Sequence, residues 1–200
     1  MGDLTRNLSK SELLKGSGYR SWSAVPREVK VRAAWFADKG FQPFRARWEE
    51  VVRKWYATTG SSHFGLQFNP RYAYVSIVRG GGIRTSATNK AIYKDKKRKP
   101  TRKSRHEWGD AIDPKPHKSL RAIWPGSTLA MYDLLAEMQK AGDIPAGGLA
   151  IYTKVDKKTG LLILRFCHFD GRGRRARWNA GHIKKARAAV KAGRVIGVAG

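Results

Sequence analysis

The chain has 200 residues, of which 41 are Lys or Arg and 15 are Asp or Glu, so its formal net charge is +26. This length fits one globular domain, and an apolar content of 41% with seven Trp argues for a folded interior and against a disordered polycation. A surface this positive attracts polyanions, and charge alone leaves nucleic acid, anionic lipid and anionic cell-wall polymer open as partners.

Cysteine content and the pattern of apolar residues limit which kind of protein this chain can be. The single cysteine, Cys167, excludes an internal disulfide and a cysteine-based zinc finger, so a metal site would need His and carboxylate ligands. No apolar run approaches the ~20 residues that span a bilayer. The N-terminal segment MGDLTRNLSKSELLK lacks the apolar stretch of a signal peptide. We therefore expect a soluble protein that is made in the cytoplasm and has no transmembrane segment.

The N-terminal part of the chain has a helical pattern. Ser9 or Ser11 is a candidate N-cap for one or two helical turns in the segment SKSELLKG. From residue 26 to about residue 58, apolar residues recur near helical spacing and are interrupted by Gly40 and Pro43. This pattern predicts two helices separated by a break.

Strands and helices follow one another in the rest of the chain. RYAYVSIVR (71–79) predicts a strand that runs into three glycines, and the segment 90–105 is so highly charged that we expect a loop. Helical spacing, a Ser cap and a closing glycine predict a helix over 127–142. Two β-rich runs flank the turn sequence DKKTG and predict a hairpin over 147–171. This order predicts an α+β fold with a small, mainly antiparallel sheet flanked by helices.

The last residues are basic and rich in small side chains, and we expect them to be partly helical between Ala180 and Ala192. We therefore predict one domain over residues 1–180 and a basic C-terminal tail over residues 181–200. We expect the protein to be a monomer.

Histidines and carboxylates in two segments could form a metal site. In the predicted hairpin, strand alternation places Phe166, His168 and Asp170 on one face. The side chains of His168 and Asp170, together with those of His106 and Asp113, suffice for a zinc site. Such a site has three N or O ligands and a fourth position for water. Each pattern alone is weak, because a lone His on a strand is usually structural and an HxxxxxxD spacing often occurs by chance.

The sequence around these residues resembles a known family. SRHEWGDAID (104–113) fits the S-x-H-x-x-G-x-A-x-D motif of the zinc D-alanyl-D-alanine carboxypeptidase-like peptidases, which are relatives of the hedgehog signalling domain. HFDGRGRRARW (168–178) resembles the second motif of one branch of that family, H-x-D-x-R-G-x-R-A-R-W. The resemblance covers residues 5–178 in patches and is weak from 14 to 74. Segments that agree in the same order are TRNLSKSEL (5–13), GIRTSATN (82–89) and GGLAIY (147–152).

The resemblance assigns roles within residues 1–180, which it makes a zinc peptidase domain of the hedgehog and D-Ala-D-Ala peptidase fold. A substrate carboxylate would be held by a two-pronged contact with Arg84. The zinc ligands would be His106, Asp113 and His168. Supporting or substrate-binding residues would be Asn89 and Ser104.

Two features depart from the family pattern. Several branches carry a Glu or Asp as general base three residues before the last His ligand, and here that position is Arg165. Asp170 is then our candidate for the general base or for orienting His168, with Glu107 the next residue to test for the base. The insertion KAIYKDKKRKPTRK (90–103) predicts a basic loop beside the site.

The remaining polar residues have simpler interpretations. Glu107 and Asp110 stand at variable positions of the first motif, so we expect solvated carboxylates there. Cys167 alternates away from His168, and we expect a buried small apolar side chain. The histidines that we expect at the surface are His63, His117 and His182.

The resemblance implies a zinc-dependent peptidase that cuts a peptide bond in the stem or crosslink of bacterial peptidoglycan. It further implies a phage lysis enzyme, or endolysin, made in the host cytoplasm and acting on the cell wall. Positive charge would concentrate such an enzyme on anionic wall polymers or lipid phosphates, and no specific nucleic acid is expected. The alternative is a nucleic-acid-binding or virion structural protein that retains the fold with a non-catalytic metal site, which composition alone would favour.

Overall fold

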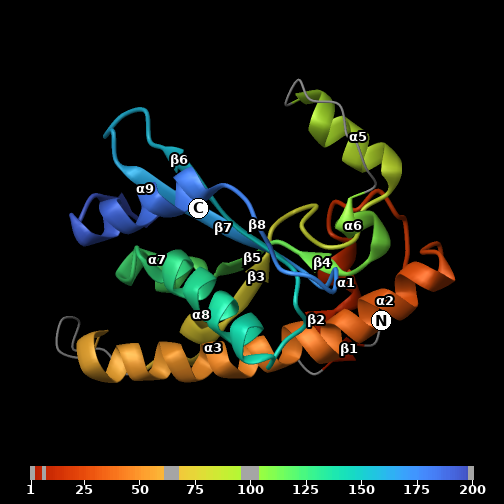
Figure 1. Cartoon of the computed structure of the whole chain (residues 1–200), viewed down its shortest axis with the longest axis horizontal. Coiled ribbons are helices and arrows are strands. Elements are labelled where there is room, and N and C mark those ends of the chain that lie inside the picture. Colours follow the sequence, from red (N-terminus) through yellow and green to blue (C-terminus); the bar gives the residue numbers. More distant parts are fainter. Residues whose placement is uncertain (1–2, 6–7, 61–67, 96–103, 198–200) are drawn as a thin grey trace.

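Helices and strands are mixed along the chain in a computed structural model that describes residues 3–5, 8–60, 68–95 and 104–197 (Figure 1). The α-helices are α1 (Lys10–Leu14), α2 (Arg27–Phe36), α3 (Gln42–Trp55), α5 (Ser86–Asp95), α6 (Arg105–Trp108), α7 (Lys118–Ile123), α8 (Ser127–Ala141) and α9 (Ala180–Lys191). Shorter helical turns are the π-helices η1 (Ala37–Phe41) and η2 (Tyr56–Gly60) and the 3-10 helix η3 (Pro70–Ala73). Among the described residues, no helix combines the length and the apolar character that crossing a membrane requires.

The strands of the described residues form three sheets. They are β1 (Asp3–Thr5), β2 (Leu8–Ser9), β3 (Val75–Ile77), β4 (Ala111–Ile112), β5 (Pro114–Pro116), β6 (Gly148–Val155), β7 (Leu162–Asp170), β8 (Ala176–Arg177) and β9 (Val195–Ile196). β1 pairs with β2 and β3 pairs with β5, both antiparallel, and the remaining strands form one larger sheet.

The N-terminal helices confirm one expectation and correct another. Ser9 caps α1, because its Oγ accepts from the Glu12 amide at 3.2 Å while the Glu12 carboxylate accepts from the Ser9 amide at 3.0 Å. The predicted break between two helices does not form, since η1 carries α2 directly into α3. Pro43 falls in the first turn of α3, where its missing N–H breaks no bond of that helix. A Cβ on Gly40 would lie 3.0 Å from the Phe36 ring, so glycine permits close packing here rather than ending the helix.

Two further segments differ from their predicted elements. The strand predicted over 71–79 is shorter, because Asn69 Oδ1 accepts from the Arg71 amide at 2.9 Å and starts the turn η3, which leaves only β3 extended. The loop predicted over 90–105 begins as helix, because α5 continues to Asp95. The rest of the predicted basic loop, residues 96–103, lies outside the described residues.

The larger sheet is built on the predicted hairpin, which is confirmed. β6 and β7 pair antiparallel with Ala150 opposite His168. The other edge of β7 pairs with β4 at one end, where Ala111 lies opposite Asp170, and with β9 at the other end. β8 runs parallel to β6, and β9 runs parallel to β7. The fold is therefore α+β as predicted, but the sheet is mixed at its margins and is not simply antiparallel.

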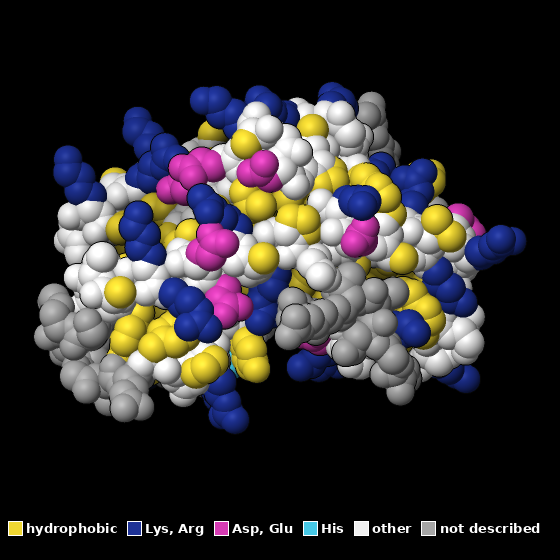
Figure 2. Space-filling model, turned by 90° about the horizontal axis from the view of Figure 1, so that it is seen from below, with side chains coloured by type: hydrophobic (Ala, Val, Ile, Leu, Met, Phe, Trp, Pro, Cys, Tyr) yellow, Lys and Arg dark blue, Asp and Glu magenta, His cyan; other side chains and the backbone are white. Residues whose placement is uncertain are grey.

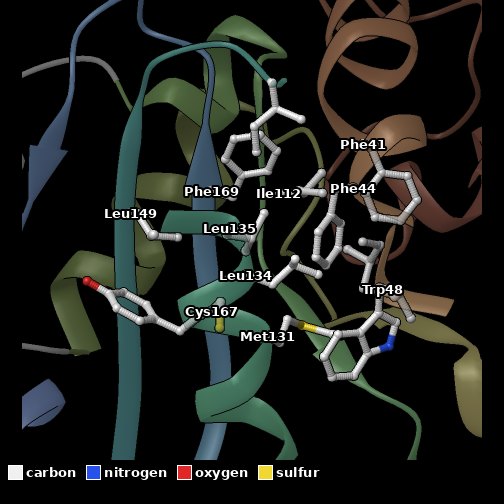
Figure 3. Packing of buried hydrophobic residues seen from close by; sticks show 14 of the residues in the cluster. Phe41, Phe44, Trp48, Ile112, Met131, Leu134, Leu135, Leu149, Cys167 and Phe169 are labelled. Atoms are coloured by element: carbon white, nitrogen blue, oxygen red, sulfur yellow. The ribbon is translucent and has the colours of Figure 1, made fainter. Parts of the chain in front are cut away.

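The hydrophobic core fixes which way β7 faces. The hairpin, α8 and α3 form successive layers (Figures 1 and 3). The core fills the space between the hairpin and α8 and the space between α8 and α3. Figure 3 shows the side chains of the hairpin, of α8 and of α3 in contact, among them Leu149, Cys167 and Phe169, then Met131, Leu134 and Leu135, then Phe44 and Trp48. Each large apolar side chain buried here stabilises the fold by roughly 1.5–3 kcal/mol. Because Cys167 and Phe169 face this core, alternation turns His168 and Asp170 to the opposite face of β7.

The sequence predicts a basic tail over 181–200, and the described residues of this segment, 181–197, pack on the same core through α9 and β9. α9 confirms the expected helical segment and buries Ala186 and Ala189 in the hydrophobic cluster. β9 then pairs with β7, and the Leu162 amide donates to the Arg194 carbonyl at 3.1 Å. Small residues on one side of α9 let the helix approach the hairpin, while its Lys and Arg side chains face solvent.

Positive charge is spread over the surface. On the face shown in Figure 2, Lys and Arg side chains project around the rim and across the middle, and Asp and Glu are fewer. Three of the described ion pairs are exposed helix contacts, Arg47 with Glu50, Arg53 with Glu49 and Arg187 with Asp133. Such pairs stabilise by about 1 kcal/mol or less, so the excess charge mainly governs what the protein attracts.

Candidate metal centre

Three separate segments bring His106, Asp113 and His168 together. His106 lies on α6, Asp113 directly follows β4, and His168 lies on β7. The pairing of β4 with β7 places the first motif beside the second. Gly109 ends α6 with a φ of 88° and turns the chain into β4, and a Cβ there would lie 2.5 Å from the Val29 carbonyl oxygen. This position therefore requires glycine.

The three side chains present a compact triangle of ligand atoms. His106 Nε2 lies 3.2 Å from His168 Nδ1 and 3.3 Å from Asp113 Oδ1, and that Oδ1 lies 2.8 Å from His168 Nδ1. All three residues are buried. Ligand atoms at roughly 2.0–2.1 Å from a tetrahedral zinc ion are about 3.3 Å apart, so the triangle has nearly the size of one face of such a site. Three protein ligands would leave a fourth position for a water or a substrate oxygen.

Hydrogen bonds on the outer side of each ring orient both histidines. His106 Nδ1 lies 2.7 Å from the Gly82 carbonyl oxygen, which can only accept, so Nδ1 carries the proton and Nε2 presents its lone pair. Burial lowers the pKa of His106 and so favours this neutral form. His168 Nε2 lies 3.1 Å from Asp170 Oδ2, which leaves Nδ1 facing Asp113. Both arrangements are typical of histidines that bind metals.

Asp170 is completely buried and fully engaged. Its Oδ1 accepts from the Gly148 amide at 2.8 Å and from Arg172 Nε at 2.8 Å. Its Oδ2 accepts from Arg172 Nη2 at 2.5 Å and faces His168. Burial alone would raise the pKa of Asp170, but the hydrogen bonds from His168 and Arg172 outweigh burial and hold it well below its usual range. These contacts describe a carboxylate that orients its neighbours, and a carboxylate so stabilised is a weak proton acceptor.

Arg84 contacts Asp113 of the triangle. Its Nη2 donates to Asp113 Oδ2 at 2.9 Å and its Nε donates to the Gly80 carbonyl, so Asp113 is held with Oδ1 toward the two histidines. Burial alone would raise the pKa of Asp113, but its histidine partners lower it well below the usual range. The Arg84 side chain is 11% exposed, and within the described residues no acceptor faces its Nη1.

The prediction of solvated carboxylates in the first motif is wrong. Glu107 is buried and accepts from Asn89 Nδ2 at 2.8 Å, from the Ser104 amide at 3.0 Å and from the Ser86 hydroxyl. Asn89 and Ser104 therefore meet at Glu107, which is next to His106 in the sequence, and among the described residues no hydrogen bond joins either of them to the triangle. The S-x-x-E spacing of Ser104 and Glu107 is that of a capping box and is the sequence signal that could have revealed this burial.

Asp110 is buried as well. It forms ion pairs with Arg105 of the same motif and, at 3.5 Å, with Arg32 of α2. Its backbone carbonyl accepts from the Gly171 amide at 2.9 Å, which ties the first motif to the second. Both variable positions of the motif thus help to hold its turn against the rest of the fold.

An aromatic group beside His168 was not foreseen. The centres of the Trp178 and His168 rings lie 5.0 Å apart, and Trp178 Nε1 donates to the Tyr152 hydroxyl at 3.3 Å. Tyr152 pairs across the hairpin with Phe166 and stacks on it at 4.7 Å, on the same face of the sheet as His168. Trp178, the last residue of the second motif, is the sequence signal for this aromatic group. Its contacts with His168 and Tyr152 could not be predicted, because they depend on the fold.

The other residues judged from sequence are accounted for. Cys167 is buried in the core, as expected. His117 caps α7 through an acceptor contact with the Ser119 amide at 3.3 Å, and His182 contacts Thr153 of β6. Both are partly exposed and away from the triangle, whereas His63 lies outside the described residues.

Comparison with protein-family models, with curated proteins and with solved structures finds no match for this chain.

Proposed function

We propose that the protein is a zinc-dependent peptidase that hydrolyses a peptide bond in the stem or crosslink of bacterial peptidoglycan, and that it acts as a phage lysis enzyme. The observation that carries this proposal is the buried triangle of His106 Nε2, Asp113 Oδ1 and His168 Nδ1, with edges of 2.8–3.3 Å. The two motifs that resemble the D-alanyl-D-alanine peptidase family supply these three residues, which supports the same activity.

The donor set fits zinc. Two neutral imidazoles and one carboxylate, in a triangle of this size and without cysteine, are ligands that zinc hydrolases use. A bound zinc ion would polarise the scissile carbonyl and lower the pKa of a water molecule from ~15.7 toward ~7. Because the first motif and β7 are held by buried contacts, the ligands are already in place before an ion binds.

The residues around the triangle have orienting, substrate-binding and supporting roles. Arg84 fixes the orientation of Asp113, and its Nη1 side can still donate to a substrate carboxylate, which is the role that the family resemblance gives it. Of the two roles that the sequence leaves open for Asp170, we assign it the orientation of His168, because its oxygens already accept from His168, Gly148 and Arg172. Asn89 and Ser104 support α6 through Glu107.

The choice of peptidoglycan rests on chemistry as well as on resemblance. Cell-wall peptides carry carboxylates, and wall polymers carry phosphates, so a chain with a net charge of +26 is attracted to this insoluble substrate. The widespread positive charge in Figure 2 suits adsorption to an extended polyanion. The same charge also suits the rival proposal, a nucleic-acid-binding or virion structural protein with a non-catalytic metal site.

Metal analysis combined with a wall assay tests the proposal. We expect one zinc ion per chain in the wild type, loss of zinc in His168→Ala, and retention in the control His182→Ala, which removes a histidine outside the site. Zinc-loaded protein should hydrolyse a stem or crosslink peptide bond in purified peptidoglycan, and mass spectrometry of the digested wall identifies the bond. A protein that binds zinc yet hydrolyses no peptide bond of the wall, and binds DNA instead, would favour the rival.

A further inference from the structure

His168 is the centre of a chain of charged contacts that extends to both sides. Asp113 contacts its Nδ1 and pairs with Arg84, while Asp170 contacts its Nε2 and pairs with Arg172. The arrangement therefore has an arginine at each end, one behind the aspartate ligand and one behind the orienting aspartate. The function proposed above gives a role in substrate binding to Arg84 alone.

The Arg172 guanidinium has one edge left for a ligand. Arginine has five N–H donors in a planar fork. Nε and Nη2 of Arg172 donate to the two oxygens of Asp170, at 2.8 and 2.5 Å, so one edge of the fork is filled. The opposite edge, formed by Nη1 and the second hydrogen of Nη2, has no acceptor among the described residues. The side chain is 27% exposed, so a solute can reach it.

The free edge is held in a fixed direction. The Arg172 guanidinium carbon lies 5.2 Å from the centre of the Trp178 ring, and the same ring lies 5.0 Å from that of His168. Trp178 thus covers one side of the guanidinium while Asp170 holds its inner edge. A fork fixed in this way loses little conformational entropy when it binds a planar carboxylate.

The surrounding segment is positive in spite of Asp170. Between Gly171 and Trp178 the chain carries four arginines and no acidic residue. Arg175 donates to the backbone carbonyls of Gln139 and Lys140, and Arg177 donates to that of Gly147, so neither charge is neutralised by a carboxylate. An anionic group that approaches Arg172 therefore meets net positive charge.

We propose that Arg172, backed by Trp178, is a second carboxylate-binding site, on the Nε2 side of His168 and opposite Arg84. This inference rests on the proposed function and deepens it, because it defines the substrate as a peptide with a carboxylate away from the scissile bond. In peptidoglycan the available groups are the free carboxylates of the D-glutamate and diaminopimelate residues and the terminal carboxylate of the stem peptide.

Peptide binding to the metal-free protein tests the site without depending on hydrolysis. The probes are a soluble stem tetrapeptide and three derivatives in each of which one carboxylate is converted to an amide. Calorimetry gives the dissociation constant of each probe for the wild type, for Arg172→Lys and for Arg174→Gln. Arg172→Lys keeps the charge and removes the fork, whereas Arg174→Gln removes an exposed charge from the same segment and serves as control.

We expect amidation of one particular carboxylate to weaken binding to the wild type and to Arg174→Gln by about 10- to 100-fold, the range for a hydrogen-bonded charged contact. The same amidation should change binding to Arg172→Lys by less than about 2-fold, whatever that substitution does to the affinity for the unmodified peptide. A purely structural role of Arg172 would lower affinity for all four probes equally.

Equal amidation penalties in the wild type and in Arg172→Lys overturn the inference, and so does failure of every probe to bind. The proposed function fails separately, if zinc-loaded wild type hydrolyses no peptide bond of peptidoglycan. The two ideas therefore have different decisive measurements.

Discussion

Asp170 faces the outer nitrogen of His168, with 3.1 Å between its Oδ2 and Nε2, and its side chain is completely buried. A carboxylate in this position fixes the imidazole ring so that Nδ1 points at the other two ligand atoms. The sequence placed both side chains on one face of a strand but could not choose between a general base and an orienting group. The six hydrogen-bond contacts of the carboxylate with Gly148, Arg172 and His168 favour the orienting role.

Asp170→Asn separates the two roles. The amide keeps the size of the side chain but weakens its hold on His168 and Arg172, so we expect zinc affinity to fall by roughly 10–100-fold and activity to return with excess zinc. A general base would behave differently, because the variant would then retain zinc and lose roughly 10²–10⁴-fold in rate at all zinc concentrations. Titration of the variant with zinc while hydrolysis is followed distinguishes these outcomes.

Arg84→Lys should affect metal affinity and substrate binding together. Lysine cannot donate to Asp113 and to Gly80 with one planar group, so we expect weaker zinc binding. At saturating zinc, hydrolysis should remain at least about 10-fold slower if the guanidinium also holds a substrate carboxylate. Wild-type rates in the saturated variant would limit Arg84 to positioning Asp113. Arg174→Lys is the matched control.

Glu107→Ala should destabilise the fold around the first motif. The substitution leaves the buried Asn89 Nδ2 and the partly buried Ser104 amide without their acceptor, and an unsatisfied buried donor costs about 1–3 kcal/mol. We expect the free energy of unfolding of the metal-free protein to fall by about 2–4 kcal/mol in urea titrations. Glu137→Ala removes an exposed glutamate of α8 and should be nearly neutral. Equal stability of the two variants would contradict the buried role of Glu107.

How far the sequence predicts this structure depends on how local the information is. The hairpin follows from alternation on both sides of a turn, and the helix over 127–142 follows from its period and its closing glycine, so both are confirmed. The three candidate ligands His106, Asp113 and His168 were predicted from two motifs, and the structure brings their ligand atoms within 4.8 Å of one another. Motif spacing works here because β4 and β7 are neighbours in the sheet.

Features that depend on distant partners were not predictable in this way. The burial of Glu107 requires Asn89 from α5, and that of Asp110 requires Arg32 from α2. Helical period likewise could not show that α2 continues through a π turn into α3, because the outcome depends on the packing of Gly40 against Phe36. Charge at residues 90–95 favours a loop, whereas these residues continue α5, which begins at Ser86 where Thr85 Oγ1 accepts from the Thr88 amide at 3.1 Å.

Zinc binding should strengthen as pH rises. Burial lowers the pKa of His168, but its contacts with Asp113 and Asp170 outweigh burial and raise it. In the metal-free protein this raised pKa adds stability below the unfolded value of ~6.5, and that stability is lost as pH rises through the folded value. Zinc requires the neutral ring, so protons compete with the ion at low pH. The increase in Tm on adding zinc should therefore be larger at pH 8 than at pH 5.5, and a Tm shift independent of pH would exclude His168 as a ligand.

Salt should separate adsorption to the wall from chemistry at the site. The charge of +26 is spread over an exposed surface, and the Debye length falls from ~10 Å at 0.1 M salt to ~3 Å at 1 M. We therefore expect binding to intact cell wall, measured by sedimentation, to weaken steeply over this range. Hydrolysis of a short soluble peptide should change much less, because the ligand atoms and Asp170 are buried and screened weakly. If the rate of hydrolysis of the soluble peptide falls in parallel with wall binding, the surface charge acts at the site itself. If binding to DNA weakens steeply with salt and binding to the wall does not, nucleic acid is the partner of the charged surface, as the rival proposal requires.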